Sequence, residues 1–534
     1  MNFNGSKTTS GPIFRNVYHM KFLKLSAFLF TCSLSIFAEA KLLQIIHSND
    51  LHSYFEGSRT GKGGYARIKT LVDQLKDDAA SKGIETYFLD AGDFGEGSSF
   101  YFSNNGVDSL KALDLLGVDA TVIGNHDFIL GGKELSHQIE KARLKADILS
   151  ANMKGKALMG LHGKVKNHVD YDLDGMKIRI FGLTTPEIHY QYSLLPYGFI
   201  APTIKKGLRI ERKAKKDKVD LLIGLTHIGL NDDISLISKS SDIDLIVGGH
   251  SHTRLDQPKM TQNLKGEIIP ILQTGAHGLA IGSLLLDVHG EGEYKLIDYR
   301  LYDVSQEIAE NQKVRQFVDQ AYINREKYFN RPWNEVIGFS EIKLTGLKEG
   351  LVHEPKSCWS HHIARLTRET AKTDLGLQLD IFQGEEIAAG EIRFGDLIDN
   401  FPHFRTWGDQ GWNISRAKVS GLLLNQVLKF LGSGDHPLDA TIDGAQVVTK
   451  NNQKKRFQLR KHQTEEILIN GKKISNFKFY TIGMPSEITH AIGTISPLIR
   501  DLLLRHSEDV KGSHFWPLFE NYIAQNSPLR CLDH

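Results

Sequence analysis

The sequence predicts an α/β protein with a layered N-terminal part, a connecting helix and a second α+β part. Three observations lead to this fold class. Residues 41–288 alternate short apolar runs with longer segments whose apolar residues recur at helical spacing. Residues 305–329 are charged with a thin apolar stripe, and Pro332 stops them, which indicates an exposed connecting helix. The 534 residues also exceed what one ordinary core fills, so two or more domains are expected.

The first forty residues have the pattern of a secretory signal peptide. Two lysines precede an apolar run over residues 25–38, and the small residues Ala38 and Ala40 follow. The run is shorter than the roughly 18–20 residues that span a bilayer, so a membrane anchor is not expected. We therefore expect a start at Met20, cleavage after Ala40, and a secreted or periplasmic protein.

Net charge and cysteine content narrow the function classes. Residues 1–40 carry four basic side chains and one acidic one, so the formal charge falls from +2 for the whole chain to −1 without them. No basic surplus remains for nucleic acid as the main partner. Outside residues 1–40 the cysteines are Cys358 and Cys531, and their spacing leaves open whether they pair.

Eight apolar runs of the N-terminal part are expected to be buried strands that end in polar residues. They are residues 41–48, 86–93, 120–127, 146–153, 177–185, 219–227, 243–253 and 269–278. Between them, residues 63–83 and 107–117 have helical spacing and end at glycines. Strands that alternate with helices form layered sheets, which collect their sites at the C-terminal ends of the strands.

The second part of the chain has a less regular pattern of apolar residues than the first part. Residues 420–432 have helical spacing, whereas 465–471 and 477–484 look like strands. We expect a signal region at 1–40, a first domain at 41–304, a connecting helix at 305–332 and a second domain at 333–534.

Seven polar side chains at five of the predicted strand ends suggest a metal site. Each short motif alone is weak evidence, but the whole set in this order is strong. Two carboxylates, one amide and four imidazoles suit a pair of divalent cations a few Å apart, and Zn, Mn, Fe, Co and Ni all stay open. The candidate ligands are Asp50, His52, Asp93, Asn125, His227, His250 and His252.

The motifs HSNDLH, LDAGDF, VIGNHDF, LTHIG and DLIVGGHSHT resemble the calcineurin-like metallophosphoesterase family. More narrowly, the chain is similar to the secreted bacterial 5′-nucleotidases and UDP-sugar hydrolases, in which Gln often stands at the place of His252. The resemblance implies a metallophosphoesterase-type β-sandwich flanked by helices and a C-terminal domain of the 5′-nucleotidase type. It assigns one metal to Asp50, His52, Asp93 and His252. It assigns the other to Asp93, Asn125, His227 and His250, with Asp93 as the bridge.

The resemblance also gives catalytic roles to His126 and Asp127. His126 is expected to face the phosphate and to stabilise charge on an oxygen or protonate the leaving group while an activated water attacks phosphorus. The family usually reads Asn-His-Glu-Phe-Asp, and its last Asp supports the histidine. Here Ile129 takes that place. Either Asp127 supports His126 instead, or Asp127 only caps a turn.

The substrate motifs of the family are missing from the second part. Glu385 and Glu386 stand where a glycine-rich arginine motif belongs, and they would repel a phosphate unless Arg393, Arg405 or a cation offsets them. Five aromatic residues nearby are expected to be core or interface residues rather than a stacking surface. They are Phe382, Phe401, Phe404, Trp407 and Trp412. No substrate contact is predicted.

Three further histidines are candidates for a metal site or for a position near the metals. His361 and His362 are expected to lie on the surface, and a second metal site beside Cys358 is the alternative. Family resemblance places His277 near the metals, behind the ligands.

These expectations combine into one leading function and two alternatives. The first is an exported dinuclear-metal phosphoesterase of small phosphate esters, nucleotides above all. The second keeps the metals but hydrolyses cyclic nucleotides or a non-nucleotide substrate. The third is a binding protein with a vestigial site.

Overall fold

The computed structural model describes most of the chain beyond residue 40, and Ala40–His534 form one compact unit. The predicted signal region and Phe382, Phe404, Arg405 and Trp407 lie outside the described residues. Among the described residues, no helix has the length and apolar character that crossing a membrane requires. The described residues are 41–58, 61–155, 160–186, 198–201, 203–344, 347–348, 352–353, 357–379, 383–402, 412–433, 440–449, 454–456, 464–486, 488 and 507–531.

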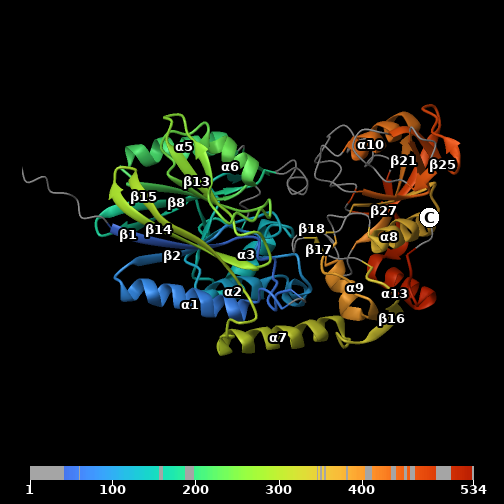
Figure 1. The fold of residues 1–534 in the computed structure, drawn as a ribbon, viewed down its shortest axis with the longest axis horizontal. Coiled ribbons are helices and arrows are strands. Elements are labelled where there is room, and N and C mark those ends of the chain that lie inside the picture. The colour runs from blue at the N-terminus through green and yellow to red at the C-terminus, as the bar shows by residue number, and fades with distance from the viewer. Residues whose placement is uncertain are drawn as a thin grey trace, which may run out of the picture. The chain divides into compact units, whose positions relative to one another are not determined.

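Two β-sheets form the centre of the N-terminal part (Figure 1). The first has the order β15 (Glu293–Asp303), β14 (Ala280–Gly290), β1 (Lys41–Ser48), β2 (Glu85–Asp90), β3 (Ala120–Val122), β4 (Asp147–Leu149) and β6 (Val165–Lys166). The second has the order β12 (Lys259–Gln262), β13 (Ile268–Leu272), β11 (Leu245–Gly248), β10 (Leu221–His227), β8 (Met176–Thr184) and β7 (His168–Leu173). From β1 to β6, and from β8 to β13 through β10 and β11, neighbouring strands run parallel.

Apolar side chains hold these layers together. Leu43 and Ile45 of β1 pack in one buried cluster with Ile223 of β10, so the two sheets face each other. The opposite face of the first sheet is covered by α1 (Tyr65–Ser81) and α2 (Val107–Leu116). The opposite face of the second is covered by α5 (Thr203–Lys216) and α6 (Leu230–Ile237). The predicted β-sandwich between helices is confirmed.

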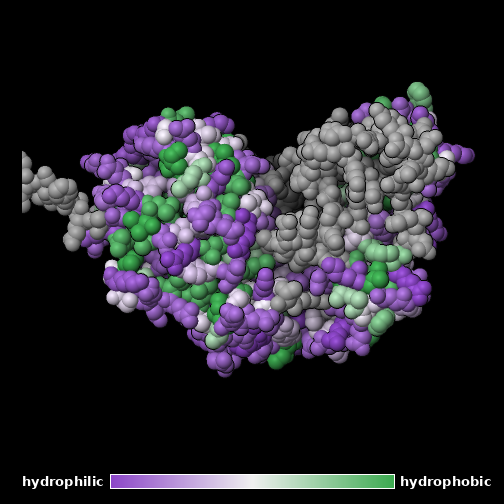
Figure 2. Space-filling model, viewed as in Figure 1, coloured by the Kyte–Doolittle hydropathy of each residue, from purple (hydrophilic) through white to green (hydrophobic). Residues whose placement is uncertain are grey.

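All eight predicted strands are present in these sheets. The two helices predicted in this part are also present, as α1 and α2. The domain also contains the 3-10 helix η1 (Ser99–Asn104), the helix α3 (Gly132–Ala142), and a pair of short strands, β5 (Met153–Gly155) and β9 (Gly198–Ile200). Where side chains are described in Figure 2, the surface is mainly hydrophilic with smaller hydrophobic patches, as expected for amphipathic helices whose apolar side faces a sheet.

The connecting segment differs from its prediction in where its helix begins. The helix α7 (Gln312–Phe329) begins seven residues later than the predicted start, because the side chain of Asn311 accepts hydrogen bonds from the backbone of Lys313 and Val314. Most residues of α7 are exposed or half-buried, whereas Val314 and Val318 of its apolar stripe are buried in the cluster that α1 also joins. The apolar stripe of α7 therefore attaches it to the N-terminal part.

Among its described residues, the C-terminal part has two larger sheets and four helices. The five-stranded sheet has the order β22 (Ala440–Asp443), β19 (Leu375–Leu379), β27 (Phe479–Pro485), β21 (Asn413–Ser420) and β28 (Ser507–His514). The four-stranded sheet has the order β24 (Lys454–Arg456), β23 (Ala445–Thr449), β25 (Thr464–Ile469) and β26 (Lys472–Lys473). Two strand pairs and the helices complete it: β16 (Val336–Ser340) with β20 (Gly390–Arg393), β17 (Leu347–Lys348) with β18 (Val352–His353), and α8 (Cys358–Ala371), α9 (Phe394–Asn400), α10 (Gly421–Ser433) and α13 (Phe515–Asn526).

Residues that the sequence left ambiguous lie in the core of this part. Phe401 and Trp412 are buried in a single aromatic cluster, as the core interpretation predicted. The surface prediction for His361 and His362 is wrong, since both are buried. His362 binds the hydroxyl of Tyr522 at 2.7 Å through Nδ1 and the carbonyl oxygen of Arg530 at 2.9 Å through Nε2.

A disulfide joins Cys358, at the start of α8, to Cys531, with 5.1 Å between the two Cα atoms. The bond closes a loop of 173 residues and fastens the C-terminal segment that His362 also contacts. Cross-linking residues so far apart restricts the unfolded chain and stabilises the folded one.

We predict that the double substitution Cys358→Ser/Cys531→Ser lowers the free energy of unfolding by about 2–5 kcal/mol. Calorimetric melting of the variant and the oxidised parent measures the change. Dithiothreitol should bring the parent to the stability of the variant and leave the variant unchanged. Equal melting curves for all samples would contradict a stabilising bond.

Candidate metal centre

The seven predicted ligands come together at one end of the two sheets. Three chain segments follow strands β1, β2 and β3 of the first sheet, and the others belong to or follow β10 and β11 of the second. The C-terminal ends of parallel strands lie at the same edge, so face-to-face packing brings the two sets of polar residues together. Their donor atoms form two neighbouring groups.

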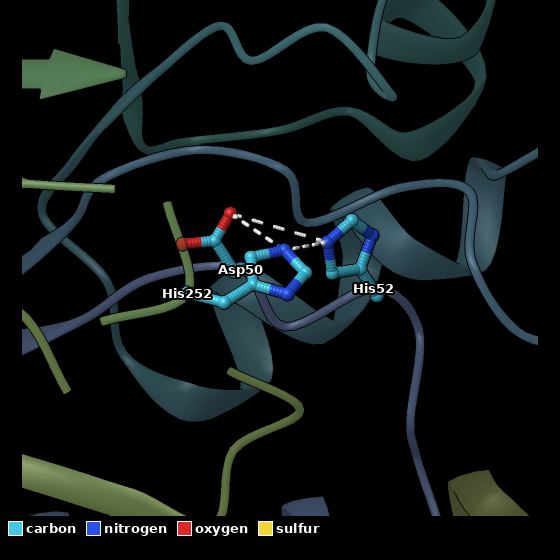
Figure 3. Close-up of side chains that lie close together, drawn as sticks. All are labelled: Asp50, His52 and His252. Atoms are coloured by element: carbon cyan, nitrogen blue, oxygen red, sulfur yellow. Dashed lines mark hydrogen bonds and ion pairs between the residues drawn. The ribbon is translucent and has the colours of Figure 1, made fainter. Parts of the chain in front are cut away.

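Asp50, His52 and His252 make the first group (Figure 3). The Nε2 atoms of the two imidazoles lie 3.1 Å apart. Oδ1 of Asp50 lies 3.4 Å from Nε2 of His252 and 3.9 Å from Nε2 of His52. The three donor atoms thus point toward a common position, as ligands of one cation do.

Asp93, His227 and His250 make the second group, and their donor atoms all lie within 4.8 Å of one another. Nε2 of His227 lies 2.9 Å from Oδ2 of Asp93 and 3.1 Å from Oδ1 of Asn125. The side-chain carbonyl of Asn125 therefore lies beside this group.

Asp93 lies between the two groups. Its Oδ2 is 2.9 Å from Nε2 of His227 and 3.9 Å from Nε2 of His52. Its Oδ1 accepts the backbone N–H of His126 at 2.8 Å. The backbone bond fixes the carboxylate, so Oδ2 is the oxygen that faces both groups.

Backbone carbonyls orient two of the imidazoles. Nδ1 of His52 lies 2.6 Å from the carbonyl oxygen of Glu96, and Nδ1 of His227 lies 2.7 Å from that of Ala91. A carbonyl oxygen only accepts, so each Nδ1 carries the hydrogen and Nε2 faces the centre. This arrangement is usual behind metal-binding histidines.

Five of the seven predicted ligands have left-handed backbone conformations. Their φ angles lie between 49° and 79°, in Asp50, His52, Asp93, His250 and His252. Such conformations cost on the order of 1–3 kcal/mol each and gather at functional sites, where the surrounding structure maintains them. The strand ends are therefore bent so that successive side chains reach the centre.

The charge of the centre suits cations. Asp50 and Asp93 are at most 1% exposed, which is costly for carboxylates without compensating charge. Burial lowers the pKa of His227, but the charges of Asp93 and Asp50 outweigh burial and raise it to about 10. The same carboxylates attract a metal cation in place of that proton. A mixed set of imidazole, carboxylate and amide donors fits divalent transition metals.

Glu96 is a site residue that the sequence analysis missed. Its Oε2 lies 2.5 Å from Nδ1 of His126, and its own side chain is buried. Burial lowers the pKa of His126, but Asp93 and Glu96 raise it to about 9. Glu96 lies in the glycine-rich loop after β2 rather than directly at a strand end, so the pattern of strand ends did not reveal it.

Asp127 has a different environment from the one expected of a partner for His126. Its carboxylate accepts three backbone N–H bonds, from Asp93 at 2.9 Å, Gly95 at 2.8 Å and Gly124 at 2.8 Å. These contacts agree with the capping alternative and tie the loop after β2 to the loop after β3. Gly124 is needed there, since a Cβ atom would lie 2.1 Å from Oδ1 of Asp93.

Asn49 and His277 support the centre from the side of β13. Asn49 donates to Oδ2 of Asp50 and to the carbonyl of Gly275, both at 2.6 Å, and its Oδ1 accepts the backbone N–H of Thr274 at 2.7 Å. The ring of His277 lies 5.7 Å from that of His52 and 5.9 Å from that of His252, so its expected closeness to the centre is confirmed. Asn49 belongs to the HSNDLH motif, but the sequence pattern did not indicate a role for it.

The sequence of this chain is similar to a family model and to several known proteins. Residues 43–254 match the family model for the calcineurin-like phosphoesterases. The trifunctional nucleotide phosphoesterase protein YfkN of Bacillus subtilis is 26% identical over 68% of this chain, and the match spans 26% of that protein's length. The 5′-nucleotidase of Vibrio cholerae is 27% identical over 67% of this chain and 70% of its own length.

Solved structures share the whole fold. The 5′-nucleotidase precursor of Thermus thermophilus is 19% identical, with a TM-score of 0.77 over 92% of this chain and 98% of its own. The sulfate thiohydrolase SoxB of the same organism is 15% identical, with a TM-score of 0.70 over 92% and 95%. Both similarities extend through the C-terminal part of the chain.

We predict that the parent chain binds about two divalent ions and that Asp93→Ala binds neither, because Asp93 faces both groups of donors. Elemental analysis after dialysis against Mn²⁺ or Zn²⁺ measures the stoichiometry. Asp77→Ala, on the exposed side of α1, is the matched control and should bind like the parent. A full complement of metal in Asp93→Ala would refute a shared carboxylate.

Proposed function

Residues 43–254 form a calcineurin-like phosphoesterase domain, and from this premise we propose that the chain is an exported, two-metal hydrolase of small phosphate esters, nucleotides above all. The observation that carries the proposal is the meeting of all seven predicted ligands in two groups on either side of Asp93. A vestigial site would be expected to have lost members of such a set. The Cys358–Cys531 bond supports export, since disulfides persist in oxidising compartments.

The chain's own residues would hold the two ions as the sequence predicted. One ion would be held by Asp50, His52 and His252, the other would be held by Asn125, His227 and His250, and Asp93 would contribute to both. When bound, such ions lower the pKa of water and neutralise charge on the phosphoryl oxygens. Zn, Mn, Fe, Co and Ni all suit this donor set.

His126 is the proposed catalytic side chain beside the ions. Glu96 holds its Nδ1, which fixes the plane of the ring and directs Nε2 away from Glu96. An imidazole placed where negative charge develops contributes about 2.7–4 kcal/mol to a reaction of this kind. In this proposal Asp127 is a positioning residue, because its three backbone bonds fix the loops that carry Asp93 and His126.

The names of the relatives favour nucleotides as substrates. The Bacillus and Vibrio proteins are named for nucleotide hydrolysis, and we carry that substrate class to this chain as part of the proposal. Glu385 and Glu386, in place of the family's arginine motif, are the reason to include cyclic nucleotides and non-nucleotide esters in a substrate screen.

We predict that chelation abolishes hydrolysis of nucleoside monophosphates and that Mn²⁺, Zn²⁺ or Co²⁺ restores it. Release of inorganic phosphate is measured for nucleoside monophosphates, UDP-sugars, cyclic nucleotides and bis(p-nitrophenyl) phosphate. Activity that persists without metal would exclude the proposed chemistry. A metal-loaded protein that hydrolyses none of these compounds would instead support a binding protein.

We predict that Glu96→Leu lowers kcat about a hundredfold, because His126 loses the partner that holds its ring. Glu96→Gln keeps a hydrogen-bond acceptor and should recover part of the loss. Metal content should not change in either variant, since His52 is held by the backbone carbonyl of Glu96 and not by its side chain. Glu134→Gln in α3 is the control. A loss of bound metal equal to the loss of kcat would show that Glu96 acts only on the ligands.

A further inference from the structure

Three large apolar side chains are exposed next to one another in the C-terminal part. Phe477 lies in the turn between β26 and β27 and is 98% exposed. Phe479, the first residue of β27, is 59% exposed, and Leu422, in the first turn of α10, is 54% exposed. Single apolar residues are ordinary on a protein surface, whereas a group of them marks an interaction site. Leu422, Phe477 and Phe479 together form an apolar tip.

Hydrogen bonds hold the apolar tip in a fixed shape. The backbone N–H of Gly421 donates to the carbonyl oxygen of Lys478 at 2.7 Å, and that of Leu422 donates to the carbonyl oxygen of Asn476 at 3.2 Å. A backbone N–H of the same turn donates to the hydroxyl of Tyr480 at 2.9 Å, and Tyr480 is buried in the core of this part. The start of α10 and the turn are therefore joined. Because the tip is ordered before it meets a partner, binding costs little conformational entropy.

Lysines surround the apolar tip. Nζ of Lys418, on β21, lies 5.2 Å from the ring centroid of Phe479. Lys478 separates the two phenylalanines in the sequence, and Lys472 and Lys473 are exposed in the neighbouring strand β26. The tip therefore combines an apolar centre with a basic rim.

No acidic side chain of the same segments offsets this charge. Residues 413–428 and 471–485 contain four lysines, one arginine and no Asp or Glu. Neither Lys418 nor Lys478 has a carboxylate partner among the described residues. Positive charge without nearby compensation attracts an anionic surface. The rim therefore favours a negatively charged partner.

The size and shape of the apolar tip decide the kind of partner. Its three side chains expose roughly 300–400 Å², which is well below the about 800 Å² that each side of a stable protein interface buries. Single-stranded nucleic acid binds in grooves, whereas almost nothing covers Phe477. A lipid bilayer requires neither a large matching surface nor a groove. Apolar side chains enter the boundary between headgroups and acyl chains, while lysines bind anionic headgroups.

We propose that the apolar tip and its lysines bind reversibly to a membrane surface that contains anionic phospholipids, with Phe477 inserted below the headgroups. No residue of the metal centre enters this inference, so it is independent of the proposed function. The binding is peripheral, and salt weakens it because the lysine contribution is screened.

Sedimentation with lipid vesicles tests the apolar part. We expect the full chain to bind vesicles of equal parts phosphatidylcholine and phosphatidylglycerol, and Phe477→Ala to weaken this binding about tenfold or more. Leu264→Ala is the matched control and should bind like the parent. Leu264 is 67% exposed in the turn between β12 and β13, but its neighbour Lys265 is paired with Asp242 at 2.6 Å. No binding by the parent, or equal losses in the two variants, would overturn the inference.

The charge of the vesicles tests the lysines separately. Lys418→Gln/Lys478→Gln should weaken binding about tenfold or more, because each lysine near an anionic surface contributes about fivefold. The control Lys82→Gln/Lys166→Gln removes two exposed lysines that are already in ion pairs, and it should bind like the parent. Equally tight binding of the parent to pure phosphatidylcholine vesicles would overturn the role of the lysines.

A second copy of the chain is the competing occupant of the apolar tip. Analytical ultracentrifugation without vesicles distinguishes it from lipid. A monomeric parent at the concentrations used for sedimentation would support the lipid surface. A dimer that forms in the parent and is lost in Phe477→Ala would overturn it.

Discussion

Two buried carboxylates, those of Asp50 and Asp93, set the requirements for the rest of the centre. Negative charge without solvent is expensive, and it must be offset by hydrogen bonds or cations. Asp50 accepts the backbone N–H of His250, and Asp93 accepts that of His126, so each loop is fixed by the charge that it helps to enclose. The backbone bonds offset part of that charge, and imidazoles with bound cations would offset the rest. The apolar layers of the sandwich make this possible by holding the strand ends in place.

The residues behind the ligands act on more than one loop at a time. Glu96 holds His52 through its carbonyl oxygen and His126 through its carboxylate. Asp127 joins the loops after β2 and β3, and Asn49 joins the loops after β1 and β13. A shift of the backbone at Glu96, or loss of the side chain of Asp127 or Asn49, would move two parts of the centre together. Ligand geometry and the orientation of His126 are therefore mechanically coupled in this chain.

Sequence patterns predicted the layered fold and the meeting of the seven side chains, because the C-terminal ends of parallel strands lie at one edge of a sheet. The pattern of strand ends could not identify Glu96 as a site residue, because the position of Glu96 depends on how a glycine-rich loop bends. The apolar stripe of α7 was visible in the sequence, but the partners that bury Val318 were not. The surface prediction for His362 was wrong because its hydrogen-bond partners, Tyr522 and the carbonyl oxygen of Arg530, are distant from it in the sequence. Long-range contacts of polar groups leave no local pattern.

The bent backbone at the ligands limits how the centre can be redesigned for other metals. Left-handed geometry favours Gly, Asn, Asp and His over branched or bulky residues. Asp50, His52, Asp93, His250 and His252 can therefore exchange with few other side chains without added strain. Asn125 and His227 have ordinary backbone angles, so a thiolate intended to favour softer ions belongs at one of these two positions. Metal selectivity in this scaffold is thus adjustable on one side of the centre far more readily than on the other.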